Sequence, residues 1–208
     1  ETFAELIVGA AFASVMAANN ETGVIQPVEE LAAAAKKAGV PFHTDAIQAA
    51  GKFSAPLAKS GADLISLSAH KFHGPKGVGA LWIRSGLRFV PLLQGGGQES
   101  GRRSGTENVP GIVGMGAAAE MMARAAADGT LEKVRAMRDA FESKVLADVS
   151  GVTANGDREH RLPNTSHLSF DGCEAAGLLI LLDDAGVACS AGSACMTGKQ
   201  RPSHVQLA

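Results

Sequence analysis

The stretch that decides the fold runs from residue 40 to residue 79 and reads VPFHTDAIQAAGKFSAPLAKSGADLISLSAHKFHGPKGVG. Two short apolar runs within it, at residues 40–44 and 64–68, are typical of buried β-strands. Asp45 follows the first run, and Ser68-Ala69-His70-Lys71 ends the second. Ligands of open α/β sheets bind beyond the carboxyl ends of the strands. We therefore expect both segments to meet at one ligand-binding edge.

The pattern of this stretch continues on both sides of it. Further strands are predicted at residues 12–17 and 78–83, and a helix at residues 28–38, opened by Pro27 and closed by Gly39. Strands that alternate with helices predict an α/β layer built from parallel crossovers. A Gly-rich segment, residues 95–105, is expected to follow without repetitive structure.

The C-terminal half has a different pattern. Two long helices are predicted at residues 109–127 and 131–149, separated at Asp128-Gly129. Beyond Gly151 we expect strands at 165–170 and 186–189 with a helix at 174–185 between them. This order predicts a smaller α+β domain, joined to the first by the long helices.

Composition excludes several classes of protein. Of the 208 residues, 46% are hydrophobic and 19% charged, which suits a folded core. Nineteen basic against twenty-one acidic residues, with 4% aromatic residues and no tyrosine, predict no nucleic-acid partner. The apolar runs are shorter than the roughly 18–20 residues of a membrane span, so no membrane partner is expected. Three cysteines make no disulfide framework, and a cytoplasmic protein is expected.

Lys71 is the residue with the most reactive placement. It lies between an apolar strand and the tight turn Gly74-Pro75-Lys76-Gly77, where partial burial would lower its pKa and free an amine for imine formation. Asp45 would then pair with a pyridinium nitrogen. Hydrogen bonds to a ring oxygen would come from Asn20 and Gln48, and Ser68 and His70 would hold a phosphate.

Each of these residues also has a plainer interpretation. Asp45 could be only a helix cap, Lys71 a solvated surface residue, His70 a loop histidine and His43 a core residue. Co-occurrence favours the functional interpretation, because Asn20, Asp45 and Lys71 all follow predicted strands of one sheet.

Five blocks of sequence resemble pyridoxal-phosphate enzymes of the cysteine desulfurase family, which have the class V aminotransferase fold. The resemblance extends from Phe12 to Leu207. The blocks are Ala18-Asn19-Asn20-Glu21-Thr22-Gly23; His43-Thr44-Asp45-Ala46-Ile47-Gln48; Ser68-Ala69-His70-Lys71 with Gly74-Pro75-Lys76-Gly77; Gly95-Gly96-Gly97-Gln98-Glu99 with Arg103-Ser104-Gly105-Thr106; and Cys189-Ser190-Ala191-Gly192-Ser193-Ala194-Cys195.

The resemblance implies the pyridoxal-phosphate-dependent transferase fold (fold type I), with a mostly parallel sheet in a large domain and a small α+β domain. Residues 1–127 would form part of the cofactor-binding large domain. Residues 128–208 would supply a bridging helix and part of the small domain with the catalytic cysteine loop. The chain lacks an initiator Met and the upstream phosphate-binding turn, ring-stacking histidine and downstream carboxylate-binding arginine of the family, so we expect a fragment.

The resemblance also implies an activity, the removal of sulfur from L-cysteine to give L-alanine and an enzyme persulfide. Lys71 and Cys195 would be the catalytic residues, with Lys71 bonded to the cofactor. Asn20, Asp45, Gln48, Ser68 and His70 would bind pyridoxal 5'-phosphate, and Thr106 would reach the phosphate of the other subunit in a homodimer. The sulfur would pass to an iron–sulfur scaffold or another acceptor protein.

Two alternatives remain open at this point. One is a selenocysteine lyase or another class V enzyme; the other is an inactive truncated chain that serves only as a folded module. Of the other cysteines, Cys189 is expected to be buried and Cys173 to lie at a turn. Cys173, Cys189, Cys195 and His204 have no recognised metal-ligand spacing, so no metal is expected.

Overall fold

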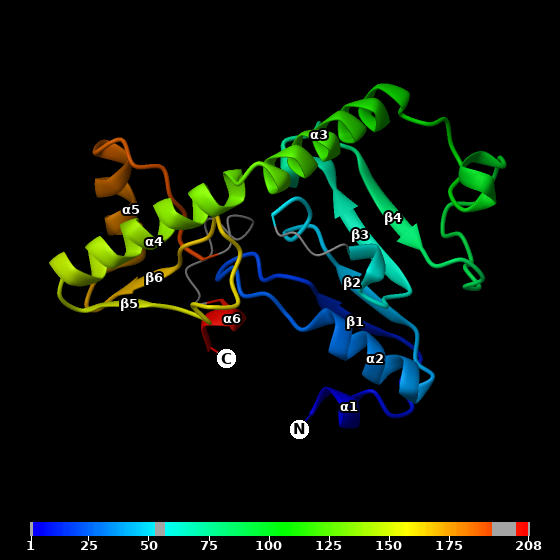
Figure 1. Ribbon diagram of the computed structural model, residues 1–208, viewed down its shortest axis with the longest axis horizontal. Coiled ribbons are helices and arrows are strands. Elements are labelled where there is room, and N and C mark those ends of the chain that lie inside the picture. The colour runs from blue at the N-terminus through cyan, green and yellow to red at the C-terminus, as the bar shows by residue number, and fades with distance from the viewer. Residues whose placement is uncertain (1, 53–56, 193–202, 208) are drawn as a thin grey trace. The chain divides into compact units, whose positions relative to one another are not determined.

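The computed structural model describes residues 2–52, 57–192 and 203–207. The chain divides into two compact units (Figure 1). The first is drawn from Glu1–Ala18 and Ile25–Leu131, and the second from Asn19–Val24 and Glu132–Ala208. The short segment Asn19–Val24 therefore belongs with the C-terminal part of the chain.

The first unit is built on a four-stranded sheet with the strand order β1-β2-β3-β4. The strands are β1 (Ala13–Met16), β2 (Phe42–Asp45), β3 (Leu64–Ser68) and β4 (Gly79–Ile83). A mostly parallel sheet is confirmed, since β1, β2 and β3 run parallel. The predicted parallel crossover is wrong for β4, which pairs antiparallel with β3. The connection at residues 69–78 is shorter than the dozen or so residues that a crossover needs.

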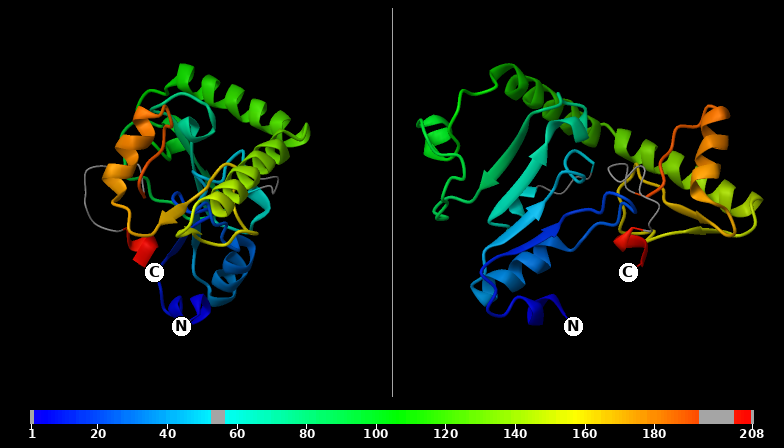
Figure 2. Two further views of the ribbon diagram at one scale, coloured as in Figure 1. Left: turned by 90° about the vertical axis from the view of Figure 1, so that its left-hand side faces the viewer. Right: turned by 180° about the vertical axis from the view of Figure 1, so that it is seen from behind.

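Helix α2 (Val28–Ala38) lies against the sheet beside β2 (Figures 1 and 2). Its bounds are those predicted, although Pro27 precedes the helix as its cap and does not open it. Gly39 ends the helix with φ +71°, a conformation that glycine adopts without steric cost. The buried side chains Val28, Ala32 and Ala35 recur at helical spacing. The preceding short helix α1 (Phe3–Leu6) packs on α2.

Helix α3 (Val109–Ala127) packs on the 3₁₀ turn η2 (Ala69–Phe72), which directly follows β3. The contact closes a small core in which Ala50, Ala69, Phe72 and Ala118 are buried. Two further 3₁₀ turns within the described residues are η1 (Leu57–Lys59) and η3 (Gln98–Gly101).

Within residues 95–105, where no repetitive structure is expected, the structure has the short turn η3. Its residues Glu99 and Ser100 have φ values of +50° and +57°, so the turn is not a regular helix. The segment 84–108 that carries η3 runs outside β4, on the side of the sheet away from β1 (Figure 1).

The second unit has an α+β composition. Its elements are α4 (Thr130–Asp148), β5 (Val152–Ala154), β6 (Leu168–Phe170), α5 (Ala175–Asp184) and α6 (His204–Leu207). The first two residues of α4 belong to the first unit. Strands β5 and β6 pair antiparallel. Helices α3 and α4 meet at Asp128-Gly129, as predicted.

Two expectations for residues 186–189 are wrong. The backbone there is irregular, because the N–H groups of Gly186 and Val187 donate to Asp183 O and Leu182 O and so close helix α5. Cys189 is exposed, not buried, whereas Cys173 follows a turn as predicted.

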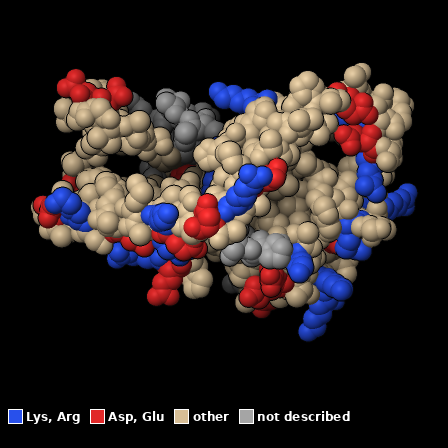
Figure 3. Space-filling view, turned by 45° about the horizontal axis from the view of Figure 1, so that its top comes forward, with Lys and Arg blue, Asp and Glu red and all other residues tan. Residues whose placement is uncertain are grey.

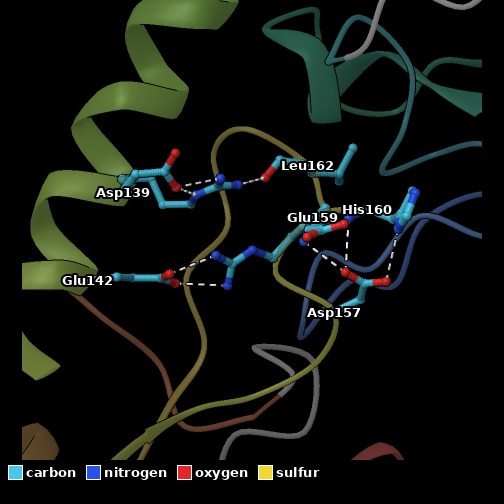
Figure 4. A network of polar contacts seen from close by, with 8 residues as sticks. Asp139, Glu142, Asp157, Glu159, His160 and Leu162 are labelled. Carbon is cyan, nitrogen blue, oxygen red and sulfur yellow. Dashed lines mark hydrogen bonds and ion pairs between the residues drawn. The ribbon is translucent and has the colours of Figure 1, made fainter.

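A buried ion pair fixes the second unit internally (Figure 4). The guanidinium of Arg161 faces the carboxylate of Glu142 on α4, at 2.8 and 2.6 Å. Both side chains are 1% exposed. The neighbouring Leu162 donates its N–H to Gly23 O at 2.9 Å, and Arg161 pairs with Val24 in a β-bridge. The pair thus ties α4 to the segment Asn19–Val24.

Candidate active site

Three parallel strands end at one edge of the sheet. Met16 on β1 is in register with Asp45 on β2, and Asp45 with Ser66 on β3. Ala17 N donates to Asp45 O at 2.7 Å, and Ala46 N to Ser66 O at 3.1 Å, so the pairing continues past the strand ends. The loops that follow β2 and β3 therefore leave the sheet side by side, as the sequence predicts.

Asp45 is held by the turn that it begins. Its Oδ1 accepts the backbone N–H of Ile47 at 2.9 Å, the geometry of an Asx turn. Among the described residues no donor reaches Oδ2, and the side chain is half-buried. The capping and the functional interpretations are therefore compatible, since one oxygen caps the turn and the other can accept from a ligand.

Lys71 lies in η2, between two side chains that anchor this turn in the core. Ala69 is fully buried and Phe72 is 4% exposed, which leaves Lys71 half-buried. The following turn is tight, because a Cβ on Gly74 would lie 2.8 Å from Ala69 Cβ. On the other side, a Cβ on Gly114 of α3 would lie 2.5 Å from Pro75. The backbone on both sides of Lys71 is thus fixed by close packing.

Ser68 and His70 form a hydrogen-bonded pair just before Lys71. Ser68 Oγ lies 2.8 Å from His70 Nδ1, with Ser68 half-buried and His70 exposed. If Ser68 donates to Nδ1, the proton of a neutral imidazole lies on Nε2, which then points away as a second donor. A hydroxyl and an imidazole side by side suit an anion such as phosphate.

Gln48 lies in the turn after β2 and accepts from Lys52, whose Nζ is 3.2 Å from Gln48 Oε1. Burial lowers the pKa of Lys52, and the charge of Lys71 lowers it further. The ammonium groups of Lys52 and Lys71 are therefore close enough to interact. The turn after β2, which carries Lys52, thus lies near η2, which carries Lys71.

The comparisons with known proteins agree with this geometry. The family model for class V aminotransferases matches residues 3–208. This chain belongs to the class V aminotransferase family. It is 53% identical over 195 residues to a cysteine desulfurase of Gluconacetobacter diazotrophicus, covering 94% of this chain and 48% of that protein. It is 49% identical over 198 residues to the cysteine desulfurase NifS of Azotobacter vinelandii, covering 95% and 49%.

Solved structures of NifS-like proteins and cysteine desulfurases are similar to this chain. The crystal structure of a NifS-like protein from Rickettsia africae superposes with a TM-score of 0.80 at 33% identity, covering 86% of this chain and 49% of that one. The apo structure of a cysteine desulfurase from Thermococcus onnurineus superposes with a TM-score of 0.78 at 27% identity, covering 89% and 50%. The chain spans about half the length of the curated relatives it matches.

The residues at the sheet edge fit the cofactor of class V aminotransferases. Pyridoxal phosphate has an aldehyde, a ring nitrogen, a ring oxygen and a phosphate. The edge offers Lys71 as an amine, Asp45 Oδ2 as an acceptor, Gln48 as an amide, and the Ser68–His70 pair as anion donors. Each of these protein groups thus has a group on the cofactor to which it could bind.

Two other predicted site residues are not shown at this edge, and a third lies outside the described residues. Asn20 belongs to the second unit, in which its neighbours Asn19, Glu21, Thr22 and Gly23 are buried while its own side chain is exposed. Thr106 is exposed in the irregular segment before α3. Cys195 lies outside the described residues.

His43 and Lys52 are two polar contributors that the sequence did not assign to the site. His43 is half-buried, as a core residue would be, and joins three strands: Nδ1 lies 2.8 Å from Ser14 Oγ and Nε2 lies 2.8 Å from Ser66 Oγ. Burial lowers the pKa of His43, and the charge of Asp45 partly offsets this. Two spacings in the sequence could have indicated these residues. His43 and Asp45 are two apart on a strand, which places their side chains on the same face of the sheet. Gln48 and Lys52 are four apart, the spacing at which side chains meet on one side of a helical turn.

The described residues contain no metal-binding cluster and no helix able to cross a membrane. A cavity of about 530 Å³ beside α3 is lined by apolar side chains such as Leu67, Phe72 and Met115, so it offers no groups for the chemistry above. On the face shown in Figure 3, basic and acidic side chains are interspersed.

Proposed function

We propose that this chain provides part of a pyridoxal-phosphate-dependent cysteine desulfurase, which converts L-cysteine to L-alanine and transfers the sulfur to a protein thiol. The observation that carries the proposal is the convergence of Asp45, Gln48 and Lys71 with the Ser68–His70 pair at one sheet edge. Relatives named cysteine desulfurase at 45–53% identity support the choice of reaction.

When bound, pyridoxal phosphate supplies an electron sink for the carbon next to the substrate amino group. Lys71 Nζ would hold the cofactor aldehyde carbon and, once released, carry a proton to or from the substrate. Asp45 Oδ2 would accept a hydrogen bond from the ring nitrogen and keep that nitrogen protonated. His70 Nε2 would donate to the phosphate, and the Ser68 hydroxyl would turn from His70 Nδ1 to donate to it as well.

Cys195 is proposed as the thiol that receives sulfur. The overall reaction breaks the carbon–sulfur bond of cysteine, adds a proton to that carbon, and forms a sulfur–sulfur bond at Cys195. No external oxidant or reductant is needed, because the carbon is reduced as the two sulfur atoms are oxidised. The attacking form would be the thiolate.

The remaining parts of the proposal concern Asn20, Thr106 and the partners. Asn20 would contact a ring substituent of the bound cofactor. Thr106 would bind the cofactor phosphate of the second subunit in a homodimer. An iron–sulfur scaffold or another acceptor would take the persulfide sulfur, in the cytoplasm, where thiols remain reduced.

The test measures alanine and protein-bound persulfide after the chain is incubated with pyridoxal phosphate and L-cysteine. We expect both products from the wild type and neither from Lys71→Ala. Cys195→Ser should lose the persulfide while it keeps the absorption of the bound cofactor. Selenocysteine replaces cysteine in a parallel assay, and faster alanine release from selenocysteine would favour a lyase. A wild-type chain that takes up no pyridoxal phosphate would refute the proposal.

A further inference from the structure

Lys52 is a half-buried cation at the candidate site with no role in the chemistry above. Its position is fixed by the backbone: Lys52 N donates to Ala49 O at 3.0 Å, and Ala50 N to Ala46 O at 2.9 Å. Ala49 and Ala50 are 1% and 8% exposed, which anchors this turn in the core. The side chain of Lys52 therefore starts from a rigid turn, four residues after Gln48.

The contact between Lys52 and Gln48 decides which end of the amide can meet a ligand. An ammonium group has three donors and no acceptor, so it can bind only the oxygen of an amide. With Nζ 3.2 Å from Oε1, the Nε2 group of Gln48 is the end left for a ligand. Gln48 then acts as a donor, and its partner on the ligand has to be an acceptor.

The neighbourhood favours an anionic acceptor. The ammonium group of Lys52 lies beside this position, 3.2 Å from Gln48 Oε1. Lys71 adds no free ammonium group there once it holds the cofactor aldehyde. A ring oxygen that has lost its proton, as the phenolic oxygen of pyridoxal phosphate can, would meet both the donor and the positive charge. A neutral hydroxyl would gain less from the same surroundings.

We propose that Lys52 is a positioning residue that holds Oε1 of Gln48, so that Nε2 of Gln48 donates to the ring oxygen of the cofactor. The identity of the ligand rests on the proposed function. The contact between Lys52 and Gln48 does not depend on the proposed function. The contact and the ligand can therefore be tested by two separate measurements.

The first measurement needs no ligand. The side-chain amide of Gln48 is identified in a ¹⁵N–¹H spectrum by its absence from Gln48→Leu. We expect Lys52→Met to shift this signal and Lys59→Met, which removes an exposed lysine of η1, to leave it in place. An unchanged signal in Lys52→Met would overturn the proposal. If Lys52→Met does not fold, Lys52→Ala takes its place.

The second measurement is a double-mutant cycle on pyridoxal phosphate affinity, followed by absorbance. Loss of a hydrogen bond to a charged group corresponds to an affinity about tenfold weaker, which we expect for Lys52→Met and for Gln48→Leu. If Lys52 acts through Gln48, the double variant binds about as weakly as Gln48→Leu alone. Losses that multiply to about a hundredfold would show that Lys52 acts on the ligand directly and would overturn the proposal.

The two measurements separate this inference from the proposed function. A wild-type chain that does not bind pyridoxal phosphate counts against the proposed function, and the amide signal then still decides whether Lys52 holds Gln48. Normal cofactor binding by Lys52→Met would refute the positioning role and leave the proposed function standing.

Discussion

Asp45 caps a turn and, under the proposed function, also binds the cofactor; a single substitution can separate the two roles. Its Oδ1 caps the turn at Ile47, and its Oδ2 is the proposed partner of the cofactor ring nitrogen. Asp45→Asn keeps an oxygen for the turn but removes the charge. We expect alanine formation to fall about a hundredfold, as when one electrostatic contact at a reacting group is lost.

Stability distinguishes the two tasks. Thermal unfolding of Asp45→Asn should match the wild type, whereas Asp45→Ala should lose about 1 kcal/mol because the turn loses its cap. A wild-type rate of alanine formation in Asp45→Asn would contradict the role of the charge.

The lowered pKa of His43 leads us to expect that the free energy of unfolding depends on pH. Burial lowers its pKa below the ordinary value of 6.5, so the folded state favours the neutral ring. The unfolded chain binds the proton first, and stability should therefore be complete above about pH 6.5 and decline as the pH falls towards the folded-state pKa. An NMR titration of the ring should give a midpoint below 6.5, and a midpoint at or above 6.5 would refute this.

At the residue scale, the sequence was informative where a side chain terminates a strand. Asp45 and the segment Ser68–Lys71 could be placed because apolar strands end visibly at polar residues. Lys52 was not placed, because its i, i+4 spacing from Gln48 does not show that the turn after β2 packs against α3. A Cβ on Gly51, beside Lys52, would lie 2.9 Å from Met122 Cβ, a proximity that no local pattern indicates.

Among the elements, α4 and the segment Asn19–Val24 are connected through the buried pair of Glu142 and Arg161. Burial alone would raise the pKa of Glu142, but hydrogen bonds from Arg161 and the charges of Arg161 and Arg138 hold it below its ordinary value. Glu142 therefore remains a carboxylate, paired through two hydrogen bonds with a buried guanidinium (Figure 4).

Removing one partner of this pair should destabilise the second unit strongly. Glu142→Ala leaves the charge of Arg161 buried without its carboxylate, which costs about 3–5 kcal/mol of unfolding free energy. The matched control is Lys144→Ala, which breaks the exposed pair with Asp148 on the same helix and should cost less than about 0.5 kcal/mol. Denaturant unfolding measures both, and equal losses in the two variants would contradict this assignment.

Element boundaries were predicted well where sequence punctuation is strong. Helix α2 ends at Gly39, and α3 and α4 separate at Asp128-Gly129, because glycine adopts a positive φ without cost. The direction of β4 was missed, since hydrophobic patterns carry no information on pairing. The strand predicted at residues 186–189 was wrong because backbone groups of Gly186 and Val187 close helix α5.

For the whole molecule, the predicted functional residues divide between two units. Lys71, Asp45 and Gln48 belong to the first, whereas Asn20 belongs to the second. This division was hidden from the sequence, because Asn19–Val24 lies between strands of the first unit but hydrogen-bonds to residues far along the chain. Ser203 Oγ, for example, donates to Glu21 at 2.6 Å.

The most direct test of the proposed chemistry is to locate the cofactor on the chain by reduction with borohydride. After incubation with pyridoxal phosphate, reduction and proteolysis, mass spectrometry should find a pyridoxyl group on Lys71 Nζ. The exposed Lys76 in the following turn is the internal control and should remain unmodified. Absence of the group from Lys71, or its presence on Lys76 instead, would contradict the proposed chemistry.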